Sequence, residues 1–445
     1  MADAGWYREM ENALPYICTG LAALITTLVC TPLAKKLAIR LDAVDYPSKR
    51  RINTVPIPRM GGLAVFAGIV VGMLVRILGA WYLGWPAVLI PHPRNESLDY
   101  RVLAVSFLII VATGVLDDVK QIKPLAKFAG QVLAASVAAA GGLVISSFLD
   151  PFDSGAVFEL GWIGYPVTVL YLVAFANIIN LIDGLDGLAT GISGIASLSM
   201  FSFAVLAGNV DAAALSIAVA GACLGFLKYN FHPASIFLGD TGSLLLGYAL
   251  GVISLLNVSR TAALTTLLIP LIVAGVPILD TFSAIVRRLR AHVSIGQADK
   301  GHIHHRLIQE GYDQRQAVLL IYAWTALLSV GAMVINQVGV RWRVVIFLVL
   351  LVASVAFANH LHLFEPVLRH HYNEETQEDE LVTPDDPAFK EEERAEQVGR
   401  EERKAHLKSL GPQGSEADQH VSADGRDDDA DRPADGGGSG PETRD

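Results

Sequence analysis

Long apolar stretches alternate with short polar segments over most of the chain. Runs of roughly 17 or more apolar residues recur, the length of a helix that crosses a membrane. We expect about eleven such helices, near residues 13–34, 60–82, 102–116, 128–149, 163–181, 188–207, 212–228, 241–257, 262–285, 316–336 and 343–363. The pattern predicts an all-α, polytopic integral membrane protein.

The composition agrees with this prediction, and the charges divide the chain in two. Of 445 residues 52% are hydrophobic, and the mean hydropathy of +0.43 is too high for an ordinary soluble domain. Residues 372–445 hold 23 acidic and 9 basic side chains, whereas residues 1–371 hold 21 and 25. We therefore predict a transmembrane domain over residues 1–363 and an acidic, disordered tail over residues 364–445. No feature indicates a nucleic-acid partner.

Lysine and arginine are unevenly placed between the predicted spans. The segments after the first, third and ninth spans are rich in these residues, and the segments that intervene are poor. Because basic residues collect on the cytoplasmic side of a cell membrane, we expect the N-terminus outside and the C-terminus in the cytoplasm. The N-terminal segment lacks a basic stretch and a cleavage site, so we expect the first span to be retained.

Four polar clusters interrupt the apolar pattern, and the first is Asp117-Asp118. This pair ends the third span on the cytoplasmic side. Acidic side chains there oppose the helix dipole, and adjacent carboxylates repel each other. Either the pair marks a membrane boundary, offset by Lys120 and Lys123, or a divalent cation makes it favourable.

The second cluster repeats a polar residue every third position, as Asn177, Asn180, Asp183 and Asp186. Each step of three residues turns by about −60° around a helix, so neighbours in the series share a face. Glycines after both aspartates favour a helix end at this point. A helix cap and turn would explain one aspartate and one glycine; it would leave the other polar residues unexplained.

The third cluster holds Asn230 and Asp240, the latter in the segment Asp-Thr-Gly-Ser that opens the eighth span. Such residues are ordinary helix caps. A helix N-terminus with small residues also suits a phosphate group, and an adjacent aspartate suits the metal ion of that phosphate.

The fourth cluster is a basic segment with Lys300, His302, His304, His305 and Arg306. Its spacing does not match a helical zinc site that includes a general-base glutamate. The three cysteines of the chain lie in apolar runs and offer no metal-binding spacing either. A basic loop that faces a phosphorylated substrate fits this cluster better.

Asp280 lies inside the ninth predicted span. An acidic residue within a membrane is costly and suggests a function. The simpler alternative is a salt bridge with Arg287, two helical turns further on.

All four clusters fall on the side that the lysine and arginine count assigns to the cytoplasm. Carboxylates for a metal ion, basic groups for phosphate and an adjacent membrane together suggest a reaction between a soluble phosphate compound and a lipid. The rival from another class is an ion-coupled transporter, which would place its acidic residues near the bilayer midplane. A membrane-bound phosphatase is a third interpretation.

The motifs, taken together and in order over about residues 30–310, resemble the polyprenyl-phosphate N-acetylhexosamine-1-phosphate transferases, a glycosyltransferase 4 type family that contains WecA, TagO and MraY. The segments that carry the resemblance are PIPRMGG (56–62), DDVKQIKP, NIINLIDGLDGLATG, NFHPASIFLGDTGSLLLG and HIHHRL.

The resemblance implies an enzyme that transfers a sugar 1-phosphate from a UDP-sugar to a polyprenyl phosphate and releases UMP. It implies Mg²⁺ as the cofactor, with Mn²⁺ as an alternative. It also implies an active site on the cytoplasmic face of the plasma (inner) membrane. Either a monomer or a homodimer is compatible with the resemblance. By resemblance, Asp117 and Asp118 form an essential acidic pair, and His304 and His305 contact phosphates. The metal ligands would be Asp240 and Asp117, and the substrate-binding residues Asn180, Asp183, Asp186 and Asn230, with Lys300, His302 and Arg306 from the basic loop.

Two details favour the WecA/TagO branch. The segments HIHH and PRMGG match it, whereas the MraY branch usually has three consecutive histidines and PTMGG. We therefore expect UDP-GlcNAc as the donor, with transfer of phospho-MurNAc-pentapeptide as the alternative. Direct attack by the lipid phosphate and a two-step reaction through a covalent aspartyl intermediate both remain open.

Overall fold

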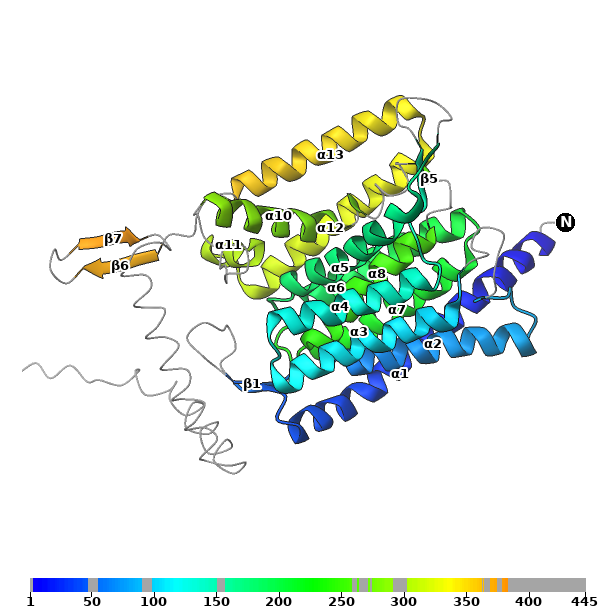
Figure 1. Ribbon diagram of the computed structural model, residues 1–445, viewed down its shortest axis with the longest axis horizontal. Helices are drawn as coiled ribbons and strands as arrows, with labels where there is room; N and C mark the ends of the chain where they lie inside the picture. Colours follow the sequence, from blue (N-terminus) through cyan, green and yellow to red (C-terminus); the bar gives the residue numbers. More distant parts are fainter. Residues whose placement is uncertain are drawn as a thin grey trace, which may run out of the picture.

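The computed structural model describes residues 3–46, 55–89, 98–149, 157–257, 262–263, 271–272, 274–290, 302–361, 363, 369–373 and 378–382. They form a bundle of long helices (Figure 1). The helices are α1 (Asp3–Arg40), α2 (Gly62–Tyr82), α3 (Tyr100–Lys120), α4 (Pro124–Ala140), α5 (Gly164–Ile182), α6 (Leu188–Leu206), α7 (Val210–Asn230), α8 (Gly239–Asn257), α10 (Gly275–Arg290), α11 (Ile303–Gln309), α12 (Gln314–Gln337) and α13 (Val340–His360), with a 3-10 turn at Gly161–Ile163.

The strands are short. Antiparallel pairs join β1 (Val44–Asp45) to β2 (Ile57–Pro58) and β3 (Ser147–Leu149) to β4 (Val157–Glu159), and β5 (Ala262–Ala263) runs parallel to β3. Within the stretch predicted to be a disordered tail, the structure describes one antiparallel hairpin, β6 (Arg369–Asn373) and β7 (Glu378–Val382). The all-α class is confirmed, because every strand is peripheral to the helices; the disorder of the tail stays a prediction.

Nine helices among the described residues are long and apolar enough to cross a membrane. The chain is therefore a multi-pass membrane protein, as the apolar pattern predicts. Of the two other predicted spans, the fourth corresponds to the 17-residue helix α4. The ninth overlaps α10, and most of the residues that precede α10 lie outside the described ranges. The count of eleven and the sides on which the termini lie stay predictions.

Local sequence explains where several helices begin. The side chain of Asp99 accepts a hydrogen bond from the backbone N–H of Arg101 at the start of α3, and Asn209 does the same for Ala212 at the start of α7. Asp313 and Gln316 form a reciprocal capping box at the start of α12. These caps satisfy backbone N–H groups that have no partner within the helix.

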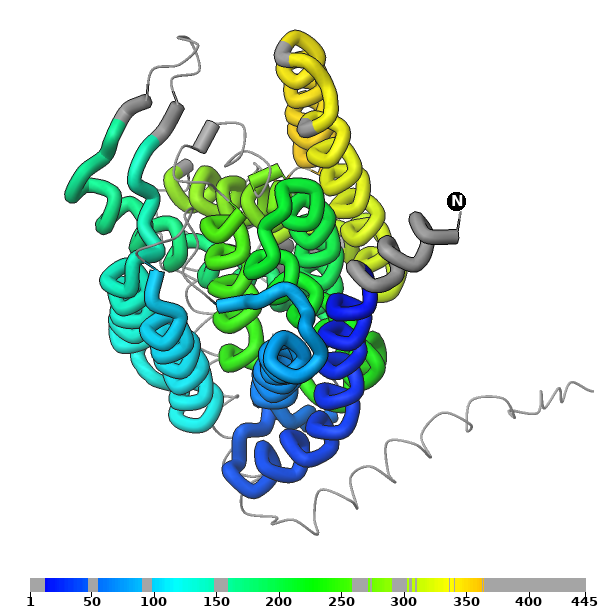
Figure 2. The backbone as a smooth tube through the Cα atoms, turned by 90° about the vertical axis from the view of Figure 1, so that its right-hand side faces the viewer, coloured from blue at the N-terminus to red at the C-terminus, as the bar shows by residue number. Residues whose placement is uncertain are grey.

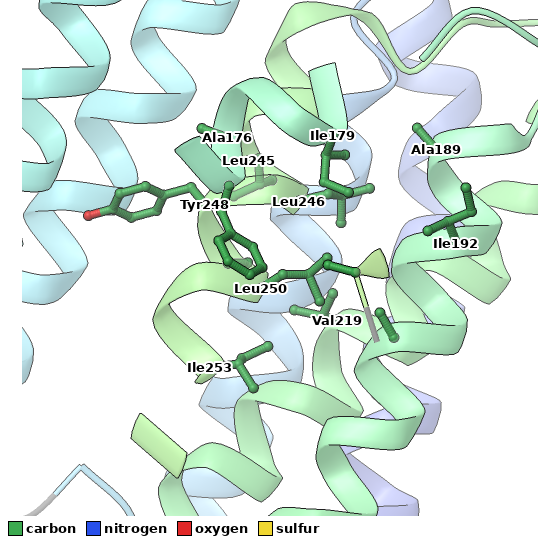
Figure 3. Close-up of a cluster of buried hydrophobic side chains, with 14 of the residues drawn as sticks. Ala176, Ile179, Ala189, Ile192, Val219, Leu245, Leu246, Tyr248, Leu250 and Ile253 are labelled. Carbon is green, nitrogen blue, oxygen red and sulfur yellow. The ribbon is translucent and has the colours of Figure 1, made fainter. Parts of the chain in front are cut away.

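Helix α8 lies at the centre of the bundle. Of the most apolar 18-residue stretch of α8, 89% is buried inside the protein, whereas only 11% of the corresponding stretch of α13, at the edge of the bundle, is buried. Neighbouring helices pack on it from several sides, α3 closely enough that a Cβ atom on Gly114 would lie 2.4 Å from the Cα atom of Thr241. Figure 3 shows part of this core, with Ala176, Ile179, Ala189, Ile192, Val219, Leu245, Leu246, Tyr248, Leu250 and Ile253.

The outer helices pack around this core. Helices α1 and α2 lie side by side, seen as dark and lighter blue tubes in Figure 2, and both contact α7. Helix α12 packs against α6 on one side and against α13 on the other. Helix α13 lies at the edge of the bundle, away from α1 and α2 (Figure 1). The faces that remain exposed on these outer helices are apolar, as expected for surfaces that meet lipid.

Candidate functional site

The C-terminal ends of α3 and α5 meet the N-terminal ends of α4 and α8 at one end of the bundle. Their polar side chains converge on the ammonium group of Lys127, in the first turn of α4. The Nζ atom of Lys127 lies 2.5 Å from Oδ1 of Asp240, 3.0 Å from Oδ2 of Asp117 and 3.1 Å from Oδ1 of Asn180. We call these three oxygen-bearing side chains the carboxylate cage.

The cage is partly open to solvent. The side chains of Lys127, Asp117 and Asp240 are 17%, 10% and 24% exposed. Asn180 fixes the orientation of Asp240, because its Nδ2 atom donates to Oδ1 of Asp240 at 2.6 Å and to Oγ of Ser243 at 2.8 Å. The cage is therefore held by hydrogen bonds on its inner side and remains accessible from outside the bundle.

Asp118 points away from the cage and caps α8. Its carboxylate accepts from the backbone N–H groups of Asp240 and Thr241, each at 2.9 Å, and from the hydroxyl of Thr241 at 2.5 Å. A carboxylate is favourable at a helix N-terminus, where it meets unpaired N–H groups and the positive end of the dipole. The two adjacent aspartates thus have separate partners. Asp118 supplies the cap that the Asp-Thr-Gly-Ser sequence was expected to supply itself.

A glycine at position 239 is required by this cap. The backbone of Gly239 has a φ angle of +72°, and a Cβ atom there would lie 2.7 Å from Oδ2 of Asp118. Any other residue would be strained in the left-handed conformation and would clash with the carboxylate. The glycine therefore lets the α8 N-terminus approach the end of α3.

The segment PIPRMGG, which precedes α2, joins the same end of the bundle. The backbone of Phe237 donates to the carbonyl of Pro58 at 2.8 Å and accepts from the N–H of Gly61 at 3.0 Å. The guanidinium of Arg59 donates to the backbone carbonyl of Asp118 at 3.0 Å. Three separate sequence motifs are thereby connected directly, and Arg59 acquires a positioning role that its sequence context did not reveal.

Asp183 and Asp186 lie beyond the end of α5 in different surroundings. The Asp183 carboxylate has no hydrogen bond or ion pair with any part of the protein that the structure describes. Burial and the nearby carboxylate of Asp240 raise the pKa of Asp183 well above its usual range. Asp186 accepts from the backbone N–H of Ala234 at 3.0 Å and lies 2.8 Å from Nδ1 of His232. Among the described residues of this region, Asp183 is thus the carboxylate without a protein partner.

Two asparagines of the polar clusters, Asn230 and Asn177, are engaged inside the protein. Asn230 is buried, accepts from the hydroxyl of Thr190 at 2.8 Å and donates to the carbonyl of Ile236 at 3.1 Å. Asn177 donates to Oε1 of Gln131 at 2.5 Å. Asn230 thereby connects α7 to α6, and Asn177 connects α5 to α4.

The basic segment contributes one buried pair. His302, at the start of α11, has its Nδ1 atom 2.9 Å from Oδ2 of Asp280, and Oδ1 of Asp280 accepts from the backbone N–H of Ile303 at 2.8 Å. Asp280 thereby has partners outside its own helix. Arg306 lies half-buried on α11, while Lys300 and the side chains of His304 and His305 lie outside the described residues.

The structure therefore brings Asp117, Asp240 and Asn180 into direct contact and adds Lys127, which sequence reasoning counted only as a basic loop residue. One signal could have found it. Pro124 marks the first turn of a helix, so Lys127 lies where a positive charge opposes the helix dipole. A lysine in that place suggests carboxylates nearby.

The donor set of the cage fits a hard cation. Within the described ranges, no group of three or more His, Cys, Asp or Glu side chains is arranged to hold a metal ion. The cage instead offers two carboxylates and an amide oxygen. Mg²⁺ prefers oxygen ligands and is commonly bound through one or two carboxylates, with water and substrate phosphates completing its shell.

Comparison with known proteins points to one family. The glycosyl transferase family 4 profile matches residues 100–258. A Bacillus subtilis protein named as a probable undecaprenyl-phosphate N-acetylglucosaminyl 1-phosphate transferase is 40% identical over 342 residues, which cover 77% of this chain and 91% of that protein. A decaprenyl-phosphate N-acetylglucosaminephosphotransferase of Mycolicibacterium smegmatis is 38% identical, covering 70% and 80%. A phospho-N-acetylmuramoyl-pentapeptide-transferase of Moorella thermoacetica is 31% identical, covering 70% and 96%.

Proposed function

The chain belongs to glycosyl transferase family 4, and from that premise we propose that it transfers GlcNAc 1-phosphate from UDP-GlcNAc to a polyprenyl phosphate, such as undecaprenyl or decaprenyl phosphate, and releases UMP. The higher identity to the two N-acetylglucosamine enzymes, 40% and 38% against 31%, supports this sugar over a MurNAc-pentapeptide. Such a transfer would begin the membrane stage of a cell-envelope polysaccharide.

The observation that carries the proposal is that oxygens of Asp117, Asp240 and Asn180 all contact the ammonium group of Lys127 at one end of the bundle. A site at the membrane edge can receive a water-soluble nucleotide sugar and a lipid phosphate together. The lysine and arginine distribution supports placing this end at the cytoplasmic face of the cell membrane.

The reaction joins two anions, so charge stabilisation dominates its physical demands. In direct transfer, an oxygen of the lipid phosphate bonds to the phosphorus attached to the sugar, while the bond from that phosphorus to the UMP oxygen breaks. Asp117 would accept the proton of the lipid phosphate or orient it. Asp183, which has no partner among the residues that the structure describes, would bind the donor. Attack by an aspartate in a two-step reaction is the alternative to direct transfer.

Mg²⁺ would be held by Asp240 and Asp117, and it would neutralise the pyrophosphate and stabilise the UMP leaving group. Asn180 would keep the Asp240 carboxylate in position through its amide group. Asp118 would act as a positioning residue, because its carboxylate is occupied by the α8 N-terminus.

The test uses the full-length protein in detergent, with Mg²⁺, polyprenyl phosphate and radiolabelled UDP-GlcNAc. Asp240→Asn should lower the transfer of label to lipid by a factor of about 10² or more. Asp99→Asn, which removes a carboxylate at the start of α3 at the opposite end of the bundle, serves as the matched control and should stay near wild type. Label transferred only from another UDP-sugar would change the donor; no transfer from any of them by folded protein would reject the enzyme.

A further inference from the structure

The ammonium group of Lys127 occupies the place that a metal ion would take in the carboxylate cage. It contacts one oxygen of each of Asp240, Asp117 and Asn180, at 2.5, 3.0 and 3.1 Å. Mg²⁺ binds oxygen ligands at about 2.0–2.1 Å. An ion bonded to the same three oxygens would therefore overlap the ammonium group and repel it.

The charges of the cage indicate that it accommodates a single cation at a time. Two carboxylates and one ammonium leave a net charge of −1, and removal of the ammonium leaves −2, which matches a divalent ion. A lysine and a divalent ion together would place three positive charges on two carboxylates.

Lys127 is able to leave. It extends from the first turn of α4 on a flexible four-carbon stem, and its side chain is 17% exposed at the open side of the cage. Asp240 does not depend on the lysine for its orientation, because the Nδ2 atom of Asn180 donates to Oδ1 of Asp240 at 2.6 Å. Departure of the lysine would therefore leave Asp240 oriented for another cation.

We propose that Lys127 and the divalent cation occupy the carboxylate cage alternately, so that the lysine closes the site when substrate is absent. This inference rests on the proposed function, since it uses the same cage as the metal site. An anionic substrate would draw the ammonium out of the cage, and strong metal binding would then depend on substrate. Lys127 would in this way suppress metal binding while contributing to transfer.

The experiment measures Mn²⁺ binding to the full-length protein in detergent, without substrate, by titration calorimetry or by the paramagnetic resonance signal of free Mn²⁺. Lys127→Met should bind Mn²⁺ at least tenfold more tightly than wild type, and so should Lys127→Gln, which keeps a polar side chain of similar length. Both variants should also transfer sugar phosphate more slowly, a combination that a general loss of structure would not produce.

Two controls isolate the ammonium group. Lys127→Arg keeps a positive charge in the cage and should bind Mn²⁺ as weakly as wild type. Lys123→Met removes an exposed lysine one helical turn earlier and should also leave the affinity unchanged. Equal or weaker Mn²⁺ binding by both Lys127→Met and Lys127→Gln would overturn the exchange.

Asp240→Asn separates this inference from the proposed function. It should abolish Mn²⁺ binding alone and in combination with Lys127→Met. Retained binding in Asp240→Asn would show that the cage is not the metal site and would overturn both. Binding lost with Asp240→Asn but unchanged with Lys127→Met would overturn the exchange and leave the metal assignment intact.

Discussion

At one end of the bundle the ammonium of Lys127 contacts three oxygens and remains partly exposed. Toward the other end the guanidinium of Arg76, on α2, is fully buried and has no hydrogen bond to any residue that the structure describes. Arg76 lies between two aromatic rings, 5.3 Å from the ring centroid of Tyr16 and 5.8 Å from that of Trp85. Gly79 leaves room for Trp85, since a Cβ atom there would lie 2.0 Å from the indole.

The two ends use charge differently: the charged groups of the carboxylate cage are arranged to bind a ligand, whereas the charge of Arg76 is enclosed within the protein. The carboxylate cage has more negative charge than its lysine neutralises, and it opens to solvent. Around Arg76 the charge is covered by ring faces, which attract cations through their quadrupoles. We therefore expect substitutions in and around the cage to affect activity and metal binding, and substitutions around Arg76 to affect stability only.

Among substitutions at the two ends of the bundle, those at Asp118 should have the largest effect. Asp118→Asn would turn an amide donor toward the N–H groups of Asp240 and Thr241, and should lower the free energy of unfolding by about 2–3 kcal/mol. Transfer should fall at least tenfold, because Asp240 loses its support. Thermal unfolding in detergent and the lipid-label assay measure the two effects.

Thr241→Val is the matched variant for Asp118. It removes only the hydroxyl donor, keeps the side-chain shape, and should cost about 1 kcal/mol with a smaller loss of activity. Unchanged activity in folded Asp118→Asn protein would contradict the positioning role, because the α8 N-terminus would then hold Asp240 without the carboxylate.

The pair Asn177–Gln131, one helical turn from the cage, should give an intermediate effect. Gln131 is buried and donates to and accepts from Asn177. Asn177→Leu leaves the amide of Gln131 unsatisfied and should cost about 1–2 kcal/mol of unfolding free energy, with transfer within a few-fold of wild type.

Combining Asn177→Leu with Gln131→Leu should recover part of that loss, because both polar groups are then removed together. A double-mutant cycle based on thermal unfolding measures the coupling. Purely additive effects would mean that the two amides act independently of each other.

Arg76→Met should have the smallest effect. Removing a buried charge that has no hydrogen bond among the described residues offsets the loss of the ring contacts, so we expect the unfolding free energy to change by less than about 1 kcal/mol. Transfer and Mn²⁺ affinity should match wild type within about twofold. A large loss of either would show that the two ends are coupled and would break the comparison.

The sequence alone determined the architecture, because apolar length and the placement of charge are local properties. Nine helices that satisfy the length and hydropathy of membrane spans lie where apolar runs predict them. Caps such as Asp99 and Asp313 are local as well. The family could be inferred too, since its motifs are contiguous and occur in a fixed order.

Only the tertiary structure decided which polar residues share a site and what each one does. Asp117 and Asp118 are adjacent in sequence, yet one contacts Lys127 of α4 and the other caps α8. Asn180 and Asp240 are far apart in sequence and meet at 2.6 Å. Such pairings depend on how the helix ends approach and on glycines such as Gly239 that permit the approach. For this reason Lys127, which in the sequence is one of several basic residues after the third predicted span, lies at the centre of the site.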